Sequence, residues 1–320
     1  MRIGVALKRG KESDMCDCYT LADIERVLGF SSNTLYGLSN NISKHYKSAY
    51  IPKHDGTKRK LSIPDVILKR VQRSIADNIL TTFPVSSYAT AYKKGSNVQS
   101  NAAPHILKNK ILKLDIDGFF DNITYSNVKN FVFTADKFTE PVQILLTMLC
   151  YHQESLPQGA PSSPTITNII MFDFDERIGA YCKDRNVAYT RYCDDMTFSG
   201  DFDHGEIISI VKNELKKLGL FIKSRKTAVV KRTKRQIVTG IVVNEKINLT
   251  KDYKRSIRQE LYYISKYGLD EHIHRLNISD KFSYVHSLMG RVAFVLQTLP
   301  NDIEFLNYKN VLKREMGGIK

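Results

Sequence analysis

Apolar and polar residues alternate along the chain with two different periods. Apolar side chains recur every three or four residues in windows that predict amphipathic helices, at 65–80, 123–155, 206–218 and through most of the last seventy residues. Shorter runs of β-prone residues predict strands, namely a hairpin over 50–64, a strand ending near Asp115, a hairpin over 187–199, a basic strand and turn over 220–227 and a strand pair over 238–244.

Residues 20–50 are predicted to form two short helices. Thr20 is placed to cap the first helix, Gly29 to end it and Ser31 to open the second. The same spacing suits a helix-turn-helix DNA reader, but the second helix lacks the side chains that such a module uses to read bases. We therefore expect a small helical cap at residues 1–50.

Two adjacent carboxylates stand at the tip of the hairpin predicted over 187–199, in the sequence Tyr192-Cys193-Asp194-Asp195. Neighbouring acids repel each other unless a positive charge lies between them. Mg²⁺ is the usual partner, because it prefers a few carboxylate oxygens together with substrate phosphates. Paired aspartates are also common as solvated turn residues, so the pair alone does not decide between a metal site and a turn.

A third acid, Asp115, follows directly on an apolar run and is therefore placed at the end of a strand, where a carboxylate can hold a metal. Asp117 and Asp121 lie further along and are equally well explained as turn or cap residues.

Two loops combine features of ligand sites and of ordinary connections. The proline-rich loop Leu156–Asn168 contains Gly159, which lets the backbone approach a ligand closely, and leads into a helix that Thr165 is expected to open. By composition alone, a simple connector is the favoured interpretation over a substrate loop. The tip of the hairpin over 50–64 can grip a nucleotide triphosphate or be merely solvated; its basic residues are Lys53, Lys58, Arg59 and Lys60.

The charge of the chain points to a polyanionic partner. Its 320 residues carry 48 Lys and Arg against 33 Asp and Glu, a net charge of +15, and residues 206–235 alone hold ten Lys or Arg and two Glu. Nucleic acid is the leading candidate. Aromatic residues among the C-terminal basic ones suit stacking on unpaired bases as well as burial in a core; they are Tyr253, Tyr262, Tyr263, Tyr267, Phe282 and Tyr284.

The five cysteines form no paired framework, and we interpret them as reduced cytosolic thiols. A zinc site using Cys16 and Cys18 is the alternative. No apolar stretch approaches about 20 residues, and the N-terminus is too short and too soon charged for a signal peptide, so we expect a cytoplasmic protein without membrane contact.

The order of these motifs resembles the palm of a reverse transcriptase: a strand-end aspartate, a Pro-Gln-Gly loop, an Asp-Asp hairpin and a turn bearing a lysine. The sequence is closer still to the bacterial retron reverse transcriptases. It shares their Leu-Pro-Gln-Gly-Ala-Pro-Ser-Ser-Pro form through Pro164, an Asn-Ala-x-x-His element at Asn101–His105 and a Val-Thr-Gly element at Val238–Gly240.

The resemblance covers roughly residues 50 to 250 and implies an α+β fold of the right-hand polymerase type. Such a fold has fingers, a palm with an antiparallel sheet and helices, and a helical thumb. We accordingly expect fingers and palm at 51–250, and a basic helical thumb for RNA binding at 251–320. The implied activity is RNA-directed DNA synthesis.

The resemblance also implies the roles of individual residues. Asp115, Asp194 and Asp195 would be catalytic ligands of two Mg²⁺ ions, which Mn²⁺ can replace, with the Ile116 carbonyl as a helper. Phe120 resembles the bulky gate against a ribose 2′-hydroxyl, so dNTPs should be preferred. The nucleotide contacts implied besides Phe120 are Gln158, Gly159, Arg59 and Lys226, the last chosen over Lys223 because it fits the family's Lys-Thr ending.

In retrons the template is a structured non-coding RNA of the msr–msd type, encoded beside the enzyme, and synthesis starts from the 2′-hydroxyl of an internal guanosine, leaving a branched RNA–DNA product. The resemblance implies the same partner here, with an anti-phage role through a separate effector protein, since we expect no further enzymatic domain. The RNA contacts that we expect are Asn101, His105, Val238, Thr239, Gly240, Lys254, Arg255 and Arg258.

Three alternatives remain beside this interpretation. A group II intron or diversity-generating reverse transcriptase would share the palm motifs, although intron enzymes usually carry a longer maturase region. An RNA-dependent RNA polymerase is disfavoured by Phe120 and the Pro-Gln-Gly loop. An inactive RNA-binding scaffold would have lost some of the three acids. One departure from the family pattern is Cys193, where alanine is usual; we expect an effect on packing near the primer end, and a thiol beside the metals is open to oxidation.

Overall fold

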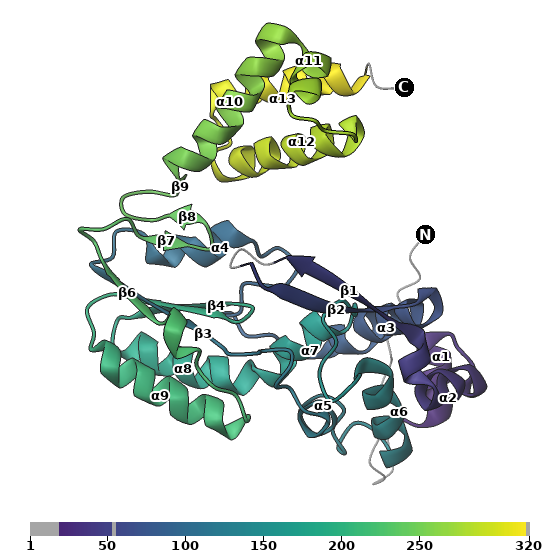
Figure 1. The fold of residues 1–320 in the computed structure, drawn as a ribbon. Coiled ribbons are helices and arrows are strands. Elements are labelled where there is room, and N and C mark those ends of the chain that lie inside the picture. Colours follow the sequence, from purple (N-terminus) through teal and green to yellow (C-terminus); the bar gives the residue numbers. More distant parts are fainter. Residues whose placement is uncertain (1–18, 53–55, 318–320) are drawn as a thin grey trace. The chain divides into compact units, whose positions relative to one another are not determined.

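The computed structural model describes residues 19–52 and 56–317, which fall into two compact units (Figure 1). Each unit is built from two stretches of chain. The first takes the residues up to Pro84 together with Gly118–Met171, and the second takes Val85–Asp117 together with the chain from Phe172 onward. The sequence predicted three regions with boundaries at 50 and 250. The two units divide the chain at other positions, and the three regions stay a prediction.

The first unit is mainly helical. The Thr20 side chain caps α1 (Leu21–Leu28), which ends at Gly29 with a left-handed φ of +74°, and Ser31 caps α2 (Ser32–Asn40), as predicted. The predicted hairpin is also present, as the antiparallel pair β1 (Tyr46–Pro52) and β2 (Lys58–Pro64). Its other helices are α3 (Val66–Asn78), α5 (Tyr125–Phe131), α6 (Glu140–Cys150) and α7 (Ser163–Ile170).

Three details of this unit differ from the expectations. The single helix expected over 123–155 is two helices, α5 and α6, and a proline in the first turn of α6 favours a new start there. The helix after the proline-rich loop begins at Ser163, two residues before Thr165. Two apolar residues of the helix predicted over 65–80, Val66 and Ile67, are 75% and 50% exposed, because α3 buries the face that carries Leu68, Val71 and Ile75.

The second unit is centred on a four-stranded antiparallel sheet in the order β4 (Ala188–Tyr192), β5 (Asp195–Ser199), β3 (Lys110–Asp115), β6 (Ala228–Lys231). Helices α8 (Phe172–Asp184) and α9 (His204–Lys217) run along one side of it (Figure 1). β3 is a central strand, paired with β5 and β6, and its apolar residues Ile111, Leu112 and Leu114 are buried.

A strand and a turn were predicted over 220–227; the turn is present, and the strand is wrong. This stretch contributes one bridge, from Ile222 to Ile116, and a 3₁₀ turn at Ser224–Lys226, and β6 begins only at Ala228. Backbone groups of the stretch bond to the end of β3, so tertiary contacts decide its conformation over its β-prone composition.

The C-terminal part of this unit is helical, as predicted. A small sheet comes first, formed by β7 (Ile237–Val238), β8 (Ile241–Val242) and β9 (Asn248–Leu249). Four helices follow, α10 (Lys251–Tyr267), α11 (Leu269–Arg275), α12 (Lys281–Thr298) and α13 (Ile303–Gly317), around one hydrophobic core. Across residues 19–52 and 56–317, none of the helices has both the length and the hydropathy needed to span a bilayer.

Candidate active site

Three carboxylates come together where β3 ends and β4 turns into β5. Asp115, the last residue of β3, is paired across the antiparallel ladder with Asp195, the first residue of β5. Asp194 lies in the two-residue turn, and its carbonyl accepts a hydrogen bond from the Ile116 N–H at 3.0 Å. The predicted position of Asp115 at a strand end is confirmed, whereas Asp195 belongs to the strand and only Asp194 to the turn.

The basic segment that follows α9 is bonded to this strand end. The Lys223 N–H donates to the Asp115 carbonyl at 2.7 Å, and the Lys223 ammonium forms an ion pair with Asp117 at 2.9 Å. The Lys226 ammonium donates to Oδ2 of Asp115. Of the two lysines that the sequence offered, Lys226 is therefore the one in contact with a carboxylate of the trio.

The trio concentrates negative charge. Loss of hydration, followed by the charges of Asp194 and Asp115, raises the pKa of Asp195 to about 6, although its side chain keeps contact with solvent. The hydrogen bond to Asp115 and the nearby aspartates raise the pKa of Lys226 above its usual value. Because three carboxylates lie close together here, the site favours a bound cation.

This donor set suits a divalent metal. Its carboxylate oxygens are hard ligands of the kind that Mg²⁺ prefers. The positive charge beside Asp115 is at present the Lys226 ammonium. In the described part of the chain, no three His, Cys, Asp or Glu side chains form a ready-made metal cage. Asp115, Asp194 and Asp195 would therefore hold a metal ion only if Lys226 turns away from Asp115, and water or substrate oxygens would supply the other ligands.

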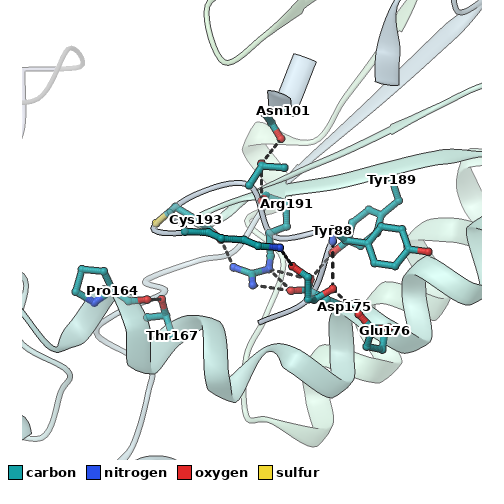
Figure 2. A network of polar contacts seen from close by, with 12 residues as sticks. Tyr88, Asn101, Pro164, Thr167, Asp175, Glu176, Tyr189, Arg191 and Cys193 are labelled. Atoms are coloured by element: carbon teal, nitrogen blue, oxygen red, sulfur yellow. Dashed lines mark hydrogen bonds and ion pairs between the residues drawn. The ribbon is translucent and has the colours of Figure 1, made fainter. Parts of the chain in front are cut away.

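The turn that carries Asp194 is held by a buried ion pair that we had not expected from the sequence (Figure 2). The Arg191 guanidinium binds the Asp175 carboxylate through two nitrogens and also donates to the Cys193 carbonyl at 2.9 Å. Arg191 and Asp175 lie 16 residues apart, on a strand and a helix, so no local pattern reveals their contact.

The Cys193 thiol lies 3.2 Å from the Tyr92 hydroxyl. Burial and the charge of Asp194 raise the pKa of this thiol to about 12. Because the thiolate is the form that reacts with oxidants, this environment disfavours the oxidation considered for Cys193 in the sequence.

The Asn-Ala-x-x-His and Val-Thr-Gly elements belong to the second unit, and each has buried residues. Asn101, in α4 (Val98–Ala102), accepts a hydrogen bond from Thr90 at 2.7 Å and donates to Thr239 at 3.2 Å. His105 bridges the hydroxyls of Thr190 and Ser199 at 2.8 and 2.7 Å. Asn101, His105 and Val238 are buried, which favours structural roles for their side chains over the predicted contact with RNA.

The turn between β7 and β8 contains the other two residues of the Val-Thr-Gly element. Thr239 and Gly240 both have positive φ, +44° and +84°. Its backbone is partly open, since Gly240 is exposed. RNA contact at this turn stays a prediction.

The three basic residues predicted on the thumb all belong to α10. Arg255 is exposed and Lys254 is half-buried. Arg258 is engaged by Glu304 of α13 through a bidentate ion pair, with distances of 2.6 to 2.8 Å. Arg258 therefore stabilises the helix packing, and its role in RNA binding stays a prediction.

The remaining predicted nucleotide contacts lie in the first unit. Gly159 approaches the backbone of β2, where the Gln158 carbonyl accepts a hydrogen bond from the Ser62 N–H at 2.9 Å. Phe120 packs edge-to-face on Phe119, and Arg59 is exposed on β2. Lys53, Cys16 and Cys18 lie outside the described residues.

Comparison with known proteins gives a family. The model of the family described as reverse transcriptase (RNA-dependent DNA polymerase) matches residues 51–251. Two solved structures share weak overall likeness. One is a foamy viral protease–reverse transcriptase in complex with double-stranded DNA; the alignment covers 84% of this chain and 43% of that chain, at 15% identity and a TM-score of 0.47. The other is a telomerase from Candida albicans; the alignment covers 84% of this chain and 63% of that chain, at 12% identity and a TM-score of 0.45.

Similar proteins of known name identify one group within this family. The retron Ec86 reverse transcriptase of Escherichia coli is 32% identical over 289 residues, covering 86% of this chain and 83% of that protein. The retron Ec83 reverse transcriptase of Escherichia coli is 28% identical, covering 85% of this chain and 89% of that protein. The retron Mx65 reverse transcriptase of Myxococcus xanthus is also 28% identical, covering 84% of this chain and 68% of that protein. The chain therefore belongs to the reverse transcriptases, and among them to the retron reverse transcriptases.

Proposed function

We propose that this RNA-directed DNA polymerase copies one cognate, structured non-coding RNA of the msr–msd type into single-stranded DNA, beginning from the 2′-hydroxyl of an internal guanosine. The observation that carries the catalytic part is the pairing of Asp115 with Asp195, next to Asp194, where the central strands β3 and β5 meet at one end of the sheet. An RNA template and nucleotide substrates follow from the family, and so does the use of divalent metal ions.

In this proposal Asp115, Asp194 and Asp195 hold two Mg²⁺ ions, or Mn²⁺ in their place, with help from the Ile116 carbonyl. Bound there, the ions would lower the pKa of the attacking hydroxyl and neutralise the leaving pyrophosphate. Asp115 is fixed by β3 and by the Lys223 N–H, and Asp194 by the Ile116 N–H, so the chain holds two of the ligands at defined backbone positions.

The other proposed roles belong to substrate binding. Lys226 would leave Asp115 as the metal binds and turn its ammonium to the pyrophosphate. Phe120 would exclude a ribose 2′-hydroxyl. Gln158, Gly159 and Arg59 would contact the incoming nucleotide. These assignments rest on the family motif.

The proposed RNA partner is supported by the charge of the protein. A net charge of +15 on 320 residues suits a polyanion, and α10 carries Lys254 and Arg255 and, about two turns further along, the exposed Tyr262. Structured RNA is recognised through its shape, its loops and its 2′-hydroxyls, with phosphate contacts from a basic surface. A separate effector protein and a role in anti-phage defence complete the proposal.

The metal assignment is tested by the double variant Asp194→Asn/Asp195→Asn. We expect it to lose DNA synthesis and to keep RNA binding, because the amides retain shape but not charge. The matched control is Asp173→Asn/Asp184→Asn, which removes two exposed carboxylates from α8 and should leave synthesis unchanged. Persistent synthesis in the first variant would refute the assignment.

The choice of template is tested separately. The protein, purified with the transcript encoded beside it, should yield a nucleic acid that is shortened by RNase and by DNase, and RNase should leave DNA with a short branched RNA remnant. RNA without attached DNA would instead support a binding scaffold, and DNA with no branch would point to another class of cellular reverse transcriptase.

A further inference from the structure

The turn between β4 and β5 has an unusual backbone. Tyr192 pairs with Asp195, which leaves Cys193 and Asp194 as the two central residues. Of these two residues, Cys193 has a positive φ, +60°, and Asp194 does not. This is the pattern of a type II′ turn, whose first central position is normally glycine. A cysteine there adopts a backbone conformation that side chains with a Cβ disfavour, so another interaction has to maintain it.

The Arg191 side chain supplies such an interaction. It donates to the Cys193 carbonyl through Nη1 at 2.9 Å, and to Asp175 through Nε at 2.9 and 3.0 Å and through Nη2 at 2.6 Å. Asp175 also accepts from the Tyr189 hydroxyl at 2.8 Å. Arg191 and Asp175 are fully buried, so water cannot replace these bonds (Figure 2).

The carbonyl that Arg191 binds belongs to the peptide between Cys193 and Asp194. Type I′ and type II′ turns differ chiefly by a flip of this central peptide. The peptide leads directly into Asp194, so its orientation fixes where that carboxylate begins. We propose that Asp175 and Arg191 are positioning residues of the polymerase centre, which lock this peptide and thereby hold Asp194 in its reactive position.

The chemistry of the pair fits positioning better than stability. A buried ion pair often adds little net stability compared with apolar residues of the same size, because burying two charges is costly. A guanidinium, however, offers several donors in one rigid plane, so it can bind a carboxylate with one edge and a carbonyl with another. Lysine has the charge without this fork. The backbone of Arg191 is fixed too, by bonds to the Tyr88 carbonyl and from the Thr90 N–H, both at 2.8 Å.

The test uses the full-length protein with Arg191→Lys, which keeps the charge beside Asp175, and Asp175→Asn, which keeps the shape. We expect kcat for primer extension to fall about 10²-fold, the size of effect that a misplacement of about 1 Å produces, with KM for dNTP and RNA binding within about threefold of the wild type. Amide hydrogen exchange should become faster in the peptide that covers residues 192–196, and not in α9. Arg177→Lys is the matched control, because Arg177 lies on the same helix as Asp175 and pairs with Glu214 at the surface, at 2.8 Å.

A rescue separates positioning from folding. Cys193→Gly, added to Arg191→Lys, removes the cost of the positive φ and should recover about tenfold of the lost kcat, since glycine adopts this conformation freely. A folded Arg191→Lys protein with normal kcat, a loss that follows only the melting temperature, or a double variant without recovery would each overturn the proposal. The inference rests on Asp194 as a proposed metal ligand. If Asp194→Asn/Asp195→Asn still synthesises DNA, the ligand assignment fails; if that variant is inactive while Arg191→Lys and Asp175→Asn are normal, only the positioning role fails.

Discussion

At the scale of single residues, Lys226 is the most informative side chain. Its ammonium lies on Asp115, while Lys223 pairs with Asp117. We expect Lys226→Met to lower the single-turnover rate of nucleotide addition by about 10²-fold, the low end of what a general acid contributes, because the pyrophosphate would leave without its proton or screening charge. Lys226→Arg should recover part of this loss.

The control for this prediction is Lys223→Met, which removes an ammonium one turn away and should change the rate by less than about threefold. Equal losses in both lysine variants would indicate a general effect of charge on RNA binding. Measuring the rate at saturating RNA and dNTP separates that effect from chemistry.

His105 provides a prediction for acid. Burial, and then the charge of Lys108, lowers its pKa to about 3 in the folded protein, against about 6.5 when unfolded. The unfolded chain binds more protons between these values, so the contribution to stability is complete above about pH 6.5. It is lost as the pH falls, by up to about 1.4 kcal/mol per unit. The thermal midpoint of His105→Gln should therefore fall less steeply between about pH 7 and 5 than that of the wild type.

The same experiment with His274→Gln serves as the control, because His274 is exposed on α11. Its midpoint should follow the wild-type curve. An unchanged slope in His105→Gln would show that the buried imidazole does not govern the acid limit.

At the scale of elements, the contact of the proline-rich loop with β2 depends on one glycine. Gly159 has φ of +125°, and a Cβ built on it would lie 2.8 Å from the Ser62 carbonyl oxygen. Gly159→Ala should cost about 1–3 kcal/mol of stability and loosen the loop from the hairpin. Gly219→Ala, at φ of +73° with open space around it, carries the backbone strain without the clash and should cost less. Thermal unfolding of the two variants compares the two costs.

The sequence predicts elements well where the signal is local. Thr20, Gly29 and Ser31 mark the first two helices because capping depends on neighbouring backbone groups, and Asp115 marks a strand end because the apolar run stops there. The strand predicted within 220–227 is wrong, since the conformation of this stretch is set by bonds to the end of β3, whereas the turn predicted there is present. The burial of Asn101 was equally hidden, because its partner Thr239 is far along the chain.

In the candidate active site, the sequence predicted the aspartates but not the residues that support their turn. Asp194 and Asp195 are adjacent in sequence and fit a family motif, so they were found without a structure. The support of their turn was missed, because a helix and a strand have to pack before Asp175 meets Arg191. Sequence reasoning finds residues that are chemically conspicuous, and it overlooks the buried ones that orient them.

At the scale of the whole molecule, the charge of +15 predicts strongly salt-dependent RNA binding. Each phosphate contact releases counterions, and six or more contacts should weaken binding by about 10³-fold or more between roughly 50 and 200 mM salt. Fluorescence anisotropy with the cognate transcript would give the slope. Lys254→Gln/Arg255→Gln should make the slope shallower, whereas a flat dependence in the wild type would argue against phosphate contacts as the main source of affinity.

The second unit is formed by two stretches of chain that are separated in the sequence by Gly118–Met171, and this order affects folding during translation. The chain completes β3 and then leaves for Gly118–Met171 before both strand partners, β5 and β6, are synthesised. On the ribosome, β3 thus emerges as an apolar strand with two open edges, the kind of segment that aggregates or recruits chaperones. Asp115 acquires its neighbours only when Asp195 and Lys226 have been translated. A nascent chain cut short before the second hairpin would carry most of the protein and no polymerase centre.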